Sequence, residues 1–204
     1  MSLGLDSETI SFWGVIIFSV LGAWGLWKQT LFIWKERSGQ SVSVTNFSFG
    51  FGYFAVGFIY SLEKDLPALT FHAVGRMLCH LPILAGLYKF KDITRNEKIL
   101  SILFFLGIGI TCFMPSADLS FLIYSLGSVL TYAAQPLEIF RNRNSGTVEI
   151  KLHAIYFGSS IFWTIYGFAV NDFILKTTSF PNIFISILII ALCLKYRKQI
   201  QTTT

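Results

Sequence analysis

The sequence predicts an all-α protein whose seven helices cross a membrane. Of its 204 residues, 53% are hydrophobic and only 13% are charged, whereas a typical soluble domain is about 25% charged. The hydrophobic residues gather in seven stretches, each close to the ~20 residues that a helix needs to cross a bilayer. The basic residues gather in alternate gaps between these stretches. A soluble fold of this length needs more charged surface, so the composition favours a polytopic membrane protein.

The seven expected helices follow one another with short polar breaks. Val42–Leu62 and Leu119–Leu137 contain no charged residue, and Pro115 and Ser116 extend the short fourth stretch without adding charge. A buried helix of a soluble protein would explain any one stretch, but not seven in a row without amphipathic helices between them. The expected helices are Ser11–Trp34, Val42–Leu62, Leu66–Leu87, Ile99–Met114, Leu119–Phe140, Val148–Val170 and Phe173–Leu194.

Charge placement predicts the orientation of these helices. If the N-terminus lies outside, twelve of the 16 basic residues fall in inner loops and the C-terminal tail, and only Lys64 and Lys176 fall in outer loops. This bias follows the positive-inside rule, so we expect an outer N-terminus and a cytosolic C-terminus. The twelve are Lys35, Arg37, Lys89, Lys91, Arg95, Lys98, Arg141, Arg143, Lys151, Lys195, Arg197 and Lys198.

The N-terminal segment is expected to stay in the mature protein. The first ten residues contain no Lys or Arg, so the positively charged start of a cleavable signal peptide is missing. The compact chain favours a bacterial inner membrane, and a eukaryotic plasma or organelle membrane is also compatible with it.

The sequence contains no pattern typical of an enzyme. It has no zinc-protease HExxH, no phosphate-binding loop, no nucleophile elbow and no facing carboxylate pair inside an expected helix. Its three cysteines lack paired or metal-binding spacing. The basic residues flank the membrane helices instead of forming a nucleic-acid surface. We therefore expect a non-enzymatic protein with no cofactor, no metal and no nucleic-acid partner.

An internal repeat divides the chain. Residues 29–60 match residues 135–166 at an offset of 106, with nine identities in 32 positions. We expect a first three-helix repeat over residues 11–91, a linker helix over 92–117 and a second repeat over 118–197. Because three is odd, one linker helix gives both repeats the same orientation, so the predicted fold is two parallel three-helix bundles in a 3+1+3 order. The identical pairs are Gln29/Gln135, Leu31/Leu137, Ile33/Ile139, Arg37/Arg143, Val42/Val148, Phe51/Phe157, Gly52/Gly158, Ile59/Ile165 and Tyr60/Tyr166, and Asp65/Asp172 follows one residue out of step.

An ordered set of short motifs lies on this plan. The second repeat contains Ala134–Leu137, Ser145–Glu149, Trp163–Gly167, Asn171–Asp172 and Pro181–Asn182, and the first repeat keeps Gln29, Ser41–Ser43, Tyr60 and Asp65–Pro67. Over about residues 11–197 the chain resembles the SWEET (MtN3/saliva) family of sugar transporters, within the PQ-loop superfamily. The resemblance implies two bundles that open a pocket alternately to each side of a membrane and move a mono- or disaccharide.

The resemblance also implies substrate-binding residues. Family pockets use Trp and Asn, which implies a sugar-binding role for Trp163 and for Asn182, the latter with a three-residue insertion after Asp172. Without that insertion Ser179 occupies the position, and both alternatives are open. Ser159 is a further candidate. The first repeat departs from the family because Gly57 stands in place of the Trp. The physical basis is that aromatic faces stack on sugar C–H groups and Asn or Ser binds hydroxyls, whereas packing against lipid or a neighbouring helix is the alternative.

The third expected helix carries an ionisable stripe. His72, Arg76 and His80 are spaced i, i+4, i+8, which places them on one helical face. Ionisable groups at membrane depth are costly and tend to face a bundle interior. His72 and Arg76 are therefore substrate-site candidates that fit a carboxylate and proton coupling, with bonds to neighbouring helices as the alternative. His80 is expected to be structural, because it lies near the cytosolic end beside Pro82.

Three residues near the inner helix ends are expected to form gate or hinge elements. Pro136 removes a backbone donor, and the amides of Gln29 and Gln135 can satisfy freed backbone groups. The sequence favours a sugar carrier as its function. A proton-coupled carrier of an amino acid or other carboxylate, and a non-transporting receptor or accessory protein of lipid-linked sugar metabolism, remain alternatives. The expected partners are a small-molecule substrate and the lipid bilayer, and formation of a homo-oligomer is left open.

Overall fold

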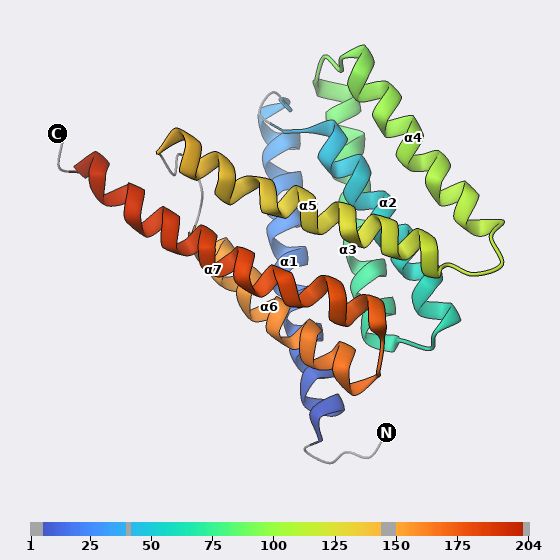
Figure 1. Cartoon of the computed structure of the whole chain (residues 1–204). Coiled ribbons are helices and arrows are strands. Elements are labelled where there is room, and N and C mark those ends of the chain that lie inside the picture. Colours follow the sequence, from blue (N-terminus) through green and yellow to red (C-terminus); the bar gives the residue numbers. More distant parts are fainter. Residues whose placement is uncertain (1–5, 40–41, 144–149, 202–204) are drawn as a thin grey trace. The chain divides into compact units, whose positions relative to one another are not determined.

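The computed structural model describes residues 6–39, 42–143 and 150–201 of the chain (Figure 1). Within these residues every regular element is an α-helix, which confirms the predicted all-α fold with seven helices. The motif residues Ser41 and 145–149 lie outside the described residues. The helices are α1 (Ser7–Glu36), α2 (Val44–Glu63), α3 (Pro67–Phe90), α4 (Arg95–Cys112), α5 (Asp118–Asn142), α6 (Ile150–Ala169) and α7 (Phe173–Gln201).

The helices group into two compact units. The N-terminal unit comprises Ser19–Tyr124, and the C-terminal unit comprises Met1–Phe18 together with Ser125–Thr204. The boundaries between the units lie inside α1 and α5, so these two helices contribute residues to both units. The repeat boundaries that the sequence predicts at residues 91 and 118 stay a prediction.

In the N-terminal unit α2 packs along both α3 and α4. A fully buried apolar cluster of Ile33, Val44, Ile83 and Leu87 joins α1, α2 and α3. A buried hydrogen bond from Ser48 Oγ to Ser101 Oγ (2.9 Å) links α2 to α4. Helix α4 is therefore tied to the first three-helix repeat by polar as well as apolar contacts.

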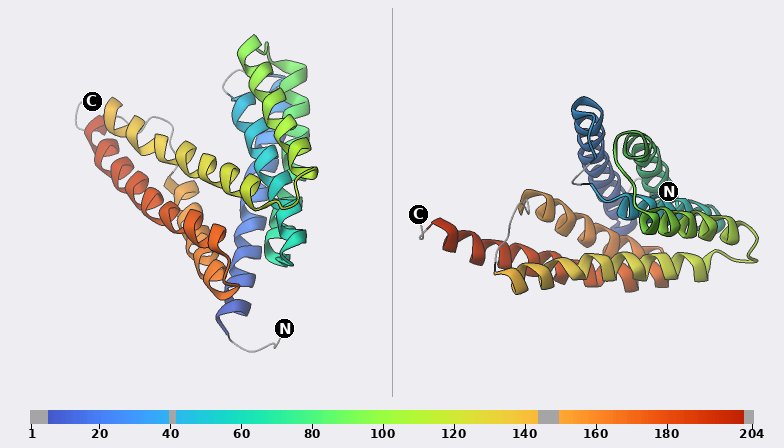
Figure 2. Two further views of the ribbon diagram at one scale, coloured as in Figure 1. Left: turned by 45° about the vertical axis from the view of Figure 1, so that its right-hand side comes forward. Right: turned by 90° about the horizontal axis from the view of Figure 1, so that it is seen from above.

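In the C-terminal unit α6 and α7 lie side by side, as both views of Figure 2 show. The buried residues Ile139, Ile189, Cys193 and Tyr196 join α5 to α7. The start of α1 contributes Phe18, whose ring lies 5.6 Å from that of Phe162 on α6. This unit is thus built from three C-terminal helices and the first half of α1.

The repeat is visible in the local backbone. The offset of the sequence repeat also relates the helix bounds. It separates the end of α1 from the end of α5, both ends of α2 from those of α6, and the start of α3 from the start of α7. Left-handed backbone conformations occur at Arg37 and Arg143 (φ 47° and 48°) and at Asp65 and Asn171 (φ 52° and 54°), and both pairs keep this offset. The two repeats therefore end their helices by the same turns.

The shared turns pair the residues of the two repeats. Asp65 is equivalent in backbone to Asn171, and the identity of Asp65 with Asp172 is one residue out of step. Helices α3 and α7 continue without a break from their equivalent starts, so α7 has no insertion relative to α3 between Asp172 and Asn182. Asn182 therefore corresponds to Arg76, and Ser179 corresponds to Ala73. Whether Asn182 or Ser179 fills the Asn position of the family stays a prediction.

Candidate functional site

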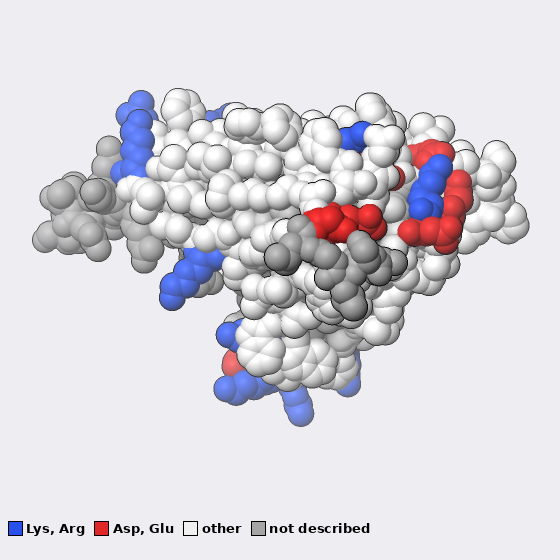
Figure 3. Space-filling model, turned by 90° about the horizontal axis from the view of Figure 1, so that it is seen from below, with Lys and Arg blue, Asp and Glu red and all other residues white. Residues whose placement is uncertain are grey.

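Within residues 6–39, 42–143 and 150–201, three helices are long and apolar enough to cross a membrane, as judged by length and composition. They are Ser7–Glu36, Pro67–Phe90 and Phe173–Tyr196, and only 22% to 33% of their most apolar windows is buried inside the protein. Most of their apolar surface is therefore exposed, as expected of helices in lipid. On the face shown in Figure 3 large uncharged areas separate the few charged side chains. Membrane crossing by the other four helices, and the orientation, stay predictions.

The ionisable stripe on α3 lies on the side of this helix that packs against α1 and α2. His72 is buried, and its Nδ1 lies 2.6 Å from Ser19 Oγ on α1. His80 is also buried, and its Nδ1 lies 2.8 Å from the backbone oxygen of Arg76. A carbonyl oxygen only accepts hydrogen bonds, so Nδ1 of His80 carries the proton.

Arg76 lies between Gly22 of α1 and Phe54 of α2. A methyl group at Gly22 would overlap the Arg76 guanidinium, so the missing side chain there makes room for it. The guanidinium carbon lies 6.0 Å from the centroid of the Phe54 ring, at the outer limit of a cation–π contact. The same ring makes edge contacts with His72 (5.4 Å) and His80 (5.3 Å). The structure thus brings the three predicted residues together around one aromatic side chain.

The candidate sugar-binding residues lie on α6 and α7. Ser159 and Trp163 are half-buried and one turn apart on α6, and the Trp163 ring makes an edge contact of 6.0 Å with Tyr166. On α7, Ser179 is 9% exposed, and Asn182 Oδ1 is buried and accepts no hydrogen bond from the described residues. Neighbouring helices therefore carry an aromatic face and an available buried acceptor.

A polar cluster that the sequence reasoning missed lies in the same unit. Tyr132 Oη of α5 lies 3.1 Å from His153 Nδ1 of α6 and 2.9 Å from Ser186 Oγ of α7. Ser186 Oγ also donates to the backbone oxygen of Asn182 at 2.7 Å. The signal was His153, an ionisable residue inside an expected membrane helix, as His72 is.

The predicted gate and hinge residues lie in different units. Gln29 is half-buried on α1 in the N-terminal unit, whereas half-buried Gln135 and buried Pro136 lie on α5 in the C-terminal unit. Pro136 has no N–H, so the carbonyl of Tyr132 lacks its usual helical donor. At the equivalent place on α1, the Thr30 hydroxyl donates to Leu26 O at 3.2 Å.

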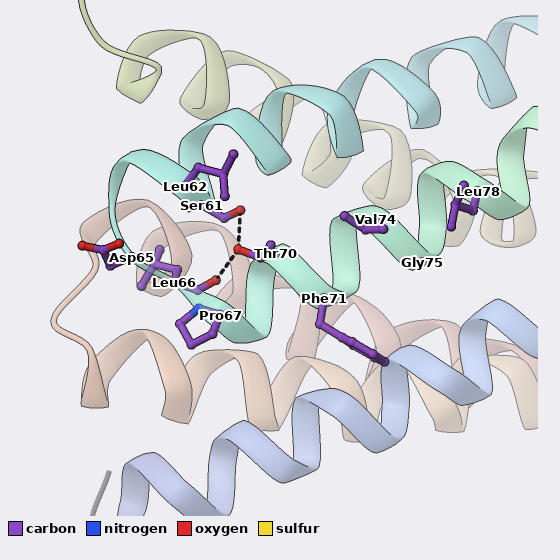
Figure 4. Close-up of a pocket in the computed structure, with 10 residues that line it drawn as sticks. All are labelled: Ser61, Leu62, Asp65, Leu66, Pro67, Thr70, Phe71, Val74, Gly75 and Leu78. Atoms are coloured by element: carbon purple, nitrogen blue, oxygen red, sulfur yellow. Dashed lines mark hydrogen bonds between the residues drawn. The ribbon is translucent and has the colours of Figure 1, made fainter.

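A groove in the N-terminal unit follows the end of α2 and one face of α3 (Figure 4). Its volume is about 840 Å³, and its polar contacts run from Thr70 Oγ1 to Ser61 Oγ (2.9 Å) and to Leu66 O (3.1 Å). The groove faces away from the stripe, since its α3 residues are offset by one or two positions from His72 and Arg76. No predicted site residue lines it. Its lining consists of Ser61, Leu62, Asp65, Leu66, Pro67, Thr70, Phe71, Val74, Gly75 and Leu78.

Charged contacts stabilise both ends of α4. These contacts lie outside the expected membrane segments. Before α4, Lys91 Nζ donates to Glu97 (2.9 Å) and to Val42 O (2.9 Å), and the bond from Lys91 holds the pKa of Glu97 below its usual value. After α4, hydrogen bonds from Ser116 and then Lys64 lower the pKa of Asp118. These charges fix helix ends and are not site residues.

Among the described residues no group of three or more His, Cys, Asp or Glu side chains could hold a metal ion. In the part of the chain that the structure describes, the buried polar residues offer hydrogen bonds, and half-buried Arg76 adds a positive charge. That chemistry suits reversible binding of a small polar molecule.

The fold and these buried polar groups define a class: an all-α membrane protein. No family model matches the sequence, and no curated protein matches it. A solved structure of a eukaryotic SWEET transporter, determined at 3.7 Å resolution, matches 94% of this chain and 97% of its own, with a TM-score of 0.72 and 16% identity. This chain therefore has the fold of a SWEET transporter, which confirms the resemblance at the level of the fold.

Proposed function

We propose that the protein is a membrane transporter that moves a small solute, with a mono- or disaccharide as its substrate, by alternating access. The observation that carries the proposal is the likeness to a SWEET transporter over nearly the full length of both chains. The exposed apolar helices support a membrane location. The buried polar residues support binding of a small polar substrate within the helices.

The proposed sugar contacts are on α6 and α7. Trp163 offers an aromatic face to sugar C–H groups, and Ser159 one turn earlier offers a hydroxyl. Asn182 Oδ1 is a buried acceptor, and a sugar hydroxyl is a suitable donor for it. Ser179 is the second candidate for a hydroxyl contact on α7.

Uptake into proteoliposomes tests this function. We expect the wild-type protein to take up radiolabelled glucose or sucrose down a gradient. Trp163→Ala and Asn182→Ala should each reduce uptake about fivefold or more, because each removes a contact of roughly 1 kcal/mol or more. Trp13→Ala is a matched control, because Trp13 is 56% exposed. Intact uptake in both variants would refute the assigned pocket, and ligand binding without uptake would indicate a receptor.

A second candidate function is proton-coupled transport of a carboxylate, such as an amino acid. The observation that favours it is the position of Arg76 and His72 together on the packed side of α3. A guanidinium binds carboxylates strongly, and a histidine can exchange a proton near neutral pH. We expect Arg76→Gln to abolish carboxylate uptake and its dependence on a pH gradient in that case, while a sugar carrier would keep its uptake.

The membrane orientation is testable in parallel. We propose that the N-terminus lies outside and the C-terminus in the cytosol, on the basis of the positive-inside rule. Impermeant labelling of single cysteines introduced at Lys64 and Lys89 should modify the first and spare the second in intact cells. The opposite pattern would reverse the proposed orientation.

A further inference from the structure

The third helix of each repeat carries a side chain that binds the backbone carbonyl one turn before it. On α3, His80 Nδ1–H donates to Arg76 O at 2.8 Å, and on α7, Ser186 Oγ–H donates to Asn182 O at 2.7 Å. Arg76 and Asn182 are separated by the offset of the sequence repeat, and so are His80 and Ser186. The two bonds therefore occupy the same place in the repeat. In both helices the bound carbonyl belongs to a predicted substrate-binding residue.

The surroundings of these bonds match in position but differ in chemistry. On α2, Gly50 leaves space for the His80 ring, whose Nε2 would lie 2.7 Å from a methyl group at that glycine. The equivalent residue on α6 is Tyr156, whose ring packs against His153 at 5.9 Å, and the residue equivalent to His80 on α7 is the small Ser186. The large residue thus lies on the third helix in one repeat and on the second helix in the other.

The direction of each hydrogen bond in the C-terminal unit follows from proton counting. Ser186 has one hydroxyl proton, which it gives to Asn182 O, because a carbonyl oxygen only accepts. Ser186 Oγ must then accept from Tyr132, which uses the single hydroxyl proton of the tyrosine. Tyr132 must in turn accept from His153 Nδ1–H. This hydrogen-bond chain runs from α6 through α5 to α7. In it, neutral His153 carries its proton on Nδ1.

These hydrogen bonds reach α5 and α7 close to prolines that weaken both helices. Pro136 of α5 lacks an N–H, so the carbonyl of Tyr132 loses its helical donor, and Pro181 of α7 does the same to Thr177. Asn182 follows Pro181 directly. A side-chain bond to the carbonyl four residues back also bends a helix. Local helix geometry at Asn182 is therefore set by contacts from α5 and α6 as well as by α7 itself.

We propose that Tyr132, His153 and Ser186 are positioning residues that hold α7 in one conformation at Asn182 and so orient the Asn182 side chain toward its ligand. The proposal rests on the proposed function, since it takes Asn182 as a substrate contact. His153 is 3% exposed, Ser186 is fully buried and Tyr132 is half-buried, so water has little access to these bonds. In the N-terminal unit, His80 is the residue equivalent to Ser186, and it binds the backbone oxygen of Arg76.

Nuclear magnetic resonance tests this hydrogen-bond chain without any substrate. In the wild-type protein we expect the ¹⁵N signals of His153, assigned by their loss in His153→Asn, to show a protonated Nδ1 and a bare Nε2. Tyr132→Phe should abolish this preference and shift the carbonyl ¹³C signal of Asn182. Ser160→Ala is the matched control, because Ser160 also donates to a carbonyl four residues back (2.8 Å) but lies outside the chain. A proton on Nε2, or an unmoved Asn182 carbonyl signal, would overturn the proposal.

Transport kinetics with glucose and sucrose test the functional consequence. Tyr132→Phe and His153→Phe should raise KM about fivefold with kcat little changed, the effect of losing roughly one buried hydrogen bond. His153→Asn, unlike His153→Phe, should keep KM near the wild-type value, because the Asn amide places a donor near the position of Nδ1. Equal changes in KM for Tyr132→Phe and for the Ser160→Ala control would overturn the positioning role. If the wild-type protein transports neither sugar, the proposed sugar function fails, and the Asn182 carbonyl signal still decides the positioning.

Discussion

Gly50 of α2 offers a direct test of how tightly α2 and α3 pack around His80. A methyl group added at Gly50 would lie 2.7 Å from His80 Nε2 and 3.3 Å from Cδ2, which is closer than such atoms pack. The imidazole cannot move aside easily. Its Nδ1–H is bonded to Arg76 O, and its ring lies 5.4 Å from the Phe47 ring and 5.3 Å from the Phe54 ring.

Gly50→Ala should therefore destabilise the N-terminal unit. Overpacking of this kind costs about 2 kcal/mol, whereas replacing a helical glycine by alanine gains about 1 kcal/mol in helix propensity. Gly25→Ala supplies the same gain without the cost, because nothing lies within 4 Å of its added methyl group. The difference between the two variants isolates the overpacking. For a chain of this size it corresponds to about 4 to 8 °C in melting temperature.

The assay is thermal unfolding of the purified protein in detergent, followed by tryptophan fluorescence. A double-mutant cycle completes it. In a His80→Ala background the imidazole is gone, so Gly50→Ala should lose its penalty and behave like Gly25→Ala. If the penalty persists without the imidazole, or if Gly50→Ala matches Gly25→Ala in the wild-type background, the reasoning about this contact is wrong.

Three further predictions concern α4 and its ends. The pKa of Glu97 is lowered in the folded state, chiefly by the bond from Lys91, so its contribution to stability is present above its unfolded pKa and is lost as pH falls through the folded pKa. Melting temperatures below about pH 4.5 should therefore fall less steeply in Glu97→Gln than in the wild type, and equal slopes would contradict this. Removing Ser48 alone should cost about 1 to 2 kcal/mol, because Ser101 loses its partner, and the double Ser48→Ala/Ser101→Ala variant should recover part of it, as measured by the melting temperature. Thr94→Ala removes the capping box of α4 and should cost about 1 kcal/mol, whereas an unchanged melting temperature would show that the cap is redundant.

The helices were predictable because lipid imposes a simple rule on sequence. Every backbone polar group must be satisfied inside a spanning segment, so each segment is one long apolar helix. The predicted stretch 173–194 starts where α7 starts, and 119–140 lies within α5. The largest error is at the C-terminal end of α7, which continues to Gln201, because charged residues end an apolar stretch without ending a helix.

The candidate site was predictable only in part. Spacing along one helix placed His72, Arg76 and His80 on a common face, since a helix fixes the angle between residues four apart. The cluster of Tyr132, His153 and Ser186 comes from three helices, and no sequence spacing relates residues on separate helices. The choice between Asn182 and Ser179 stays open, because a single chain does not show whether an insertion relative to the family precedes Asn182. The starts of α3 and α7 keep the offset of the repeat, which pairs Asn182 with Arg76 inside this chain.

The division of α1 between the two units affects the order in which the protein folds. The residues before Ser19 are synthesised first, yet they belong to the unit that is completed last. Phe18 has its ring partner only when Phe162 has been made. Domains generally fold as units during synthesis. The N-terminal unit can therefore complete its contacts before the first half of α1 makes its contacts in the C-terminal unit. The first half of α1 therefore stays without its contacts in the C-terminal unit throughout the translation of five further helices.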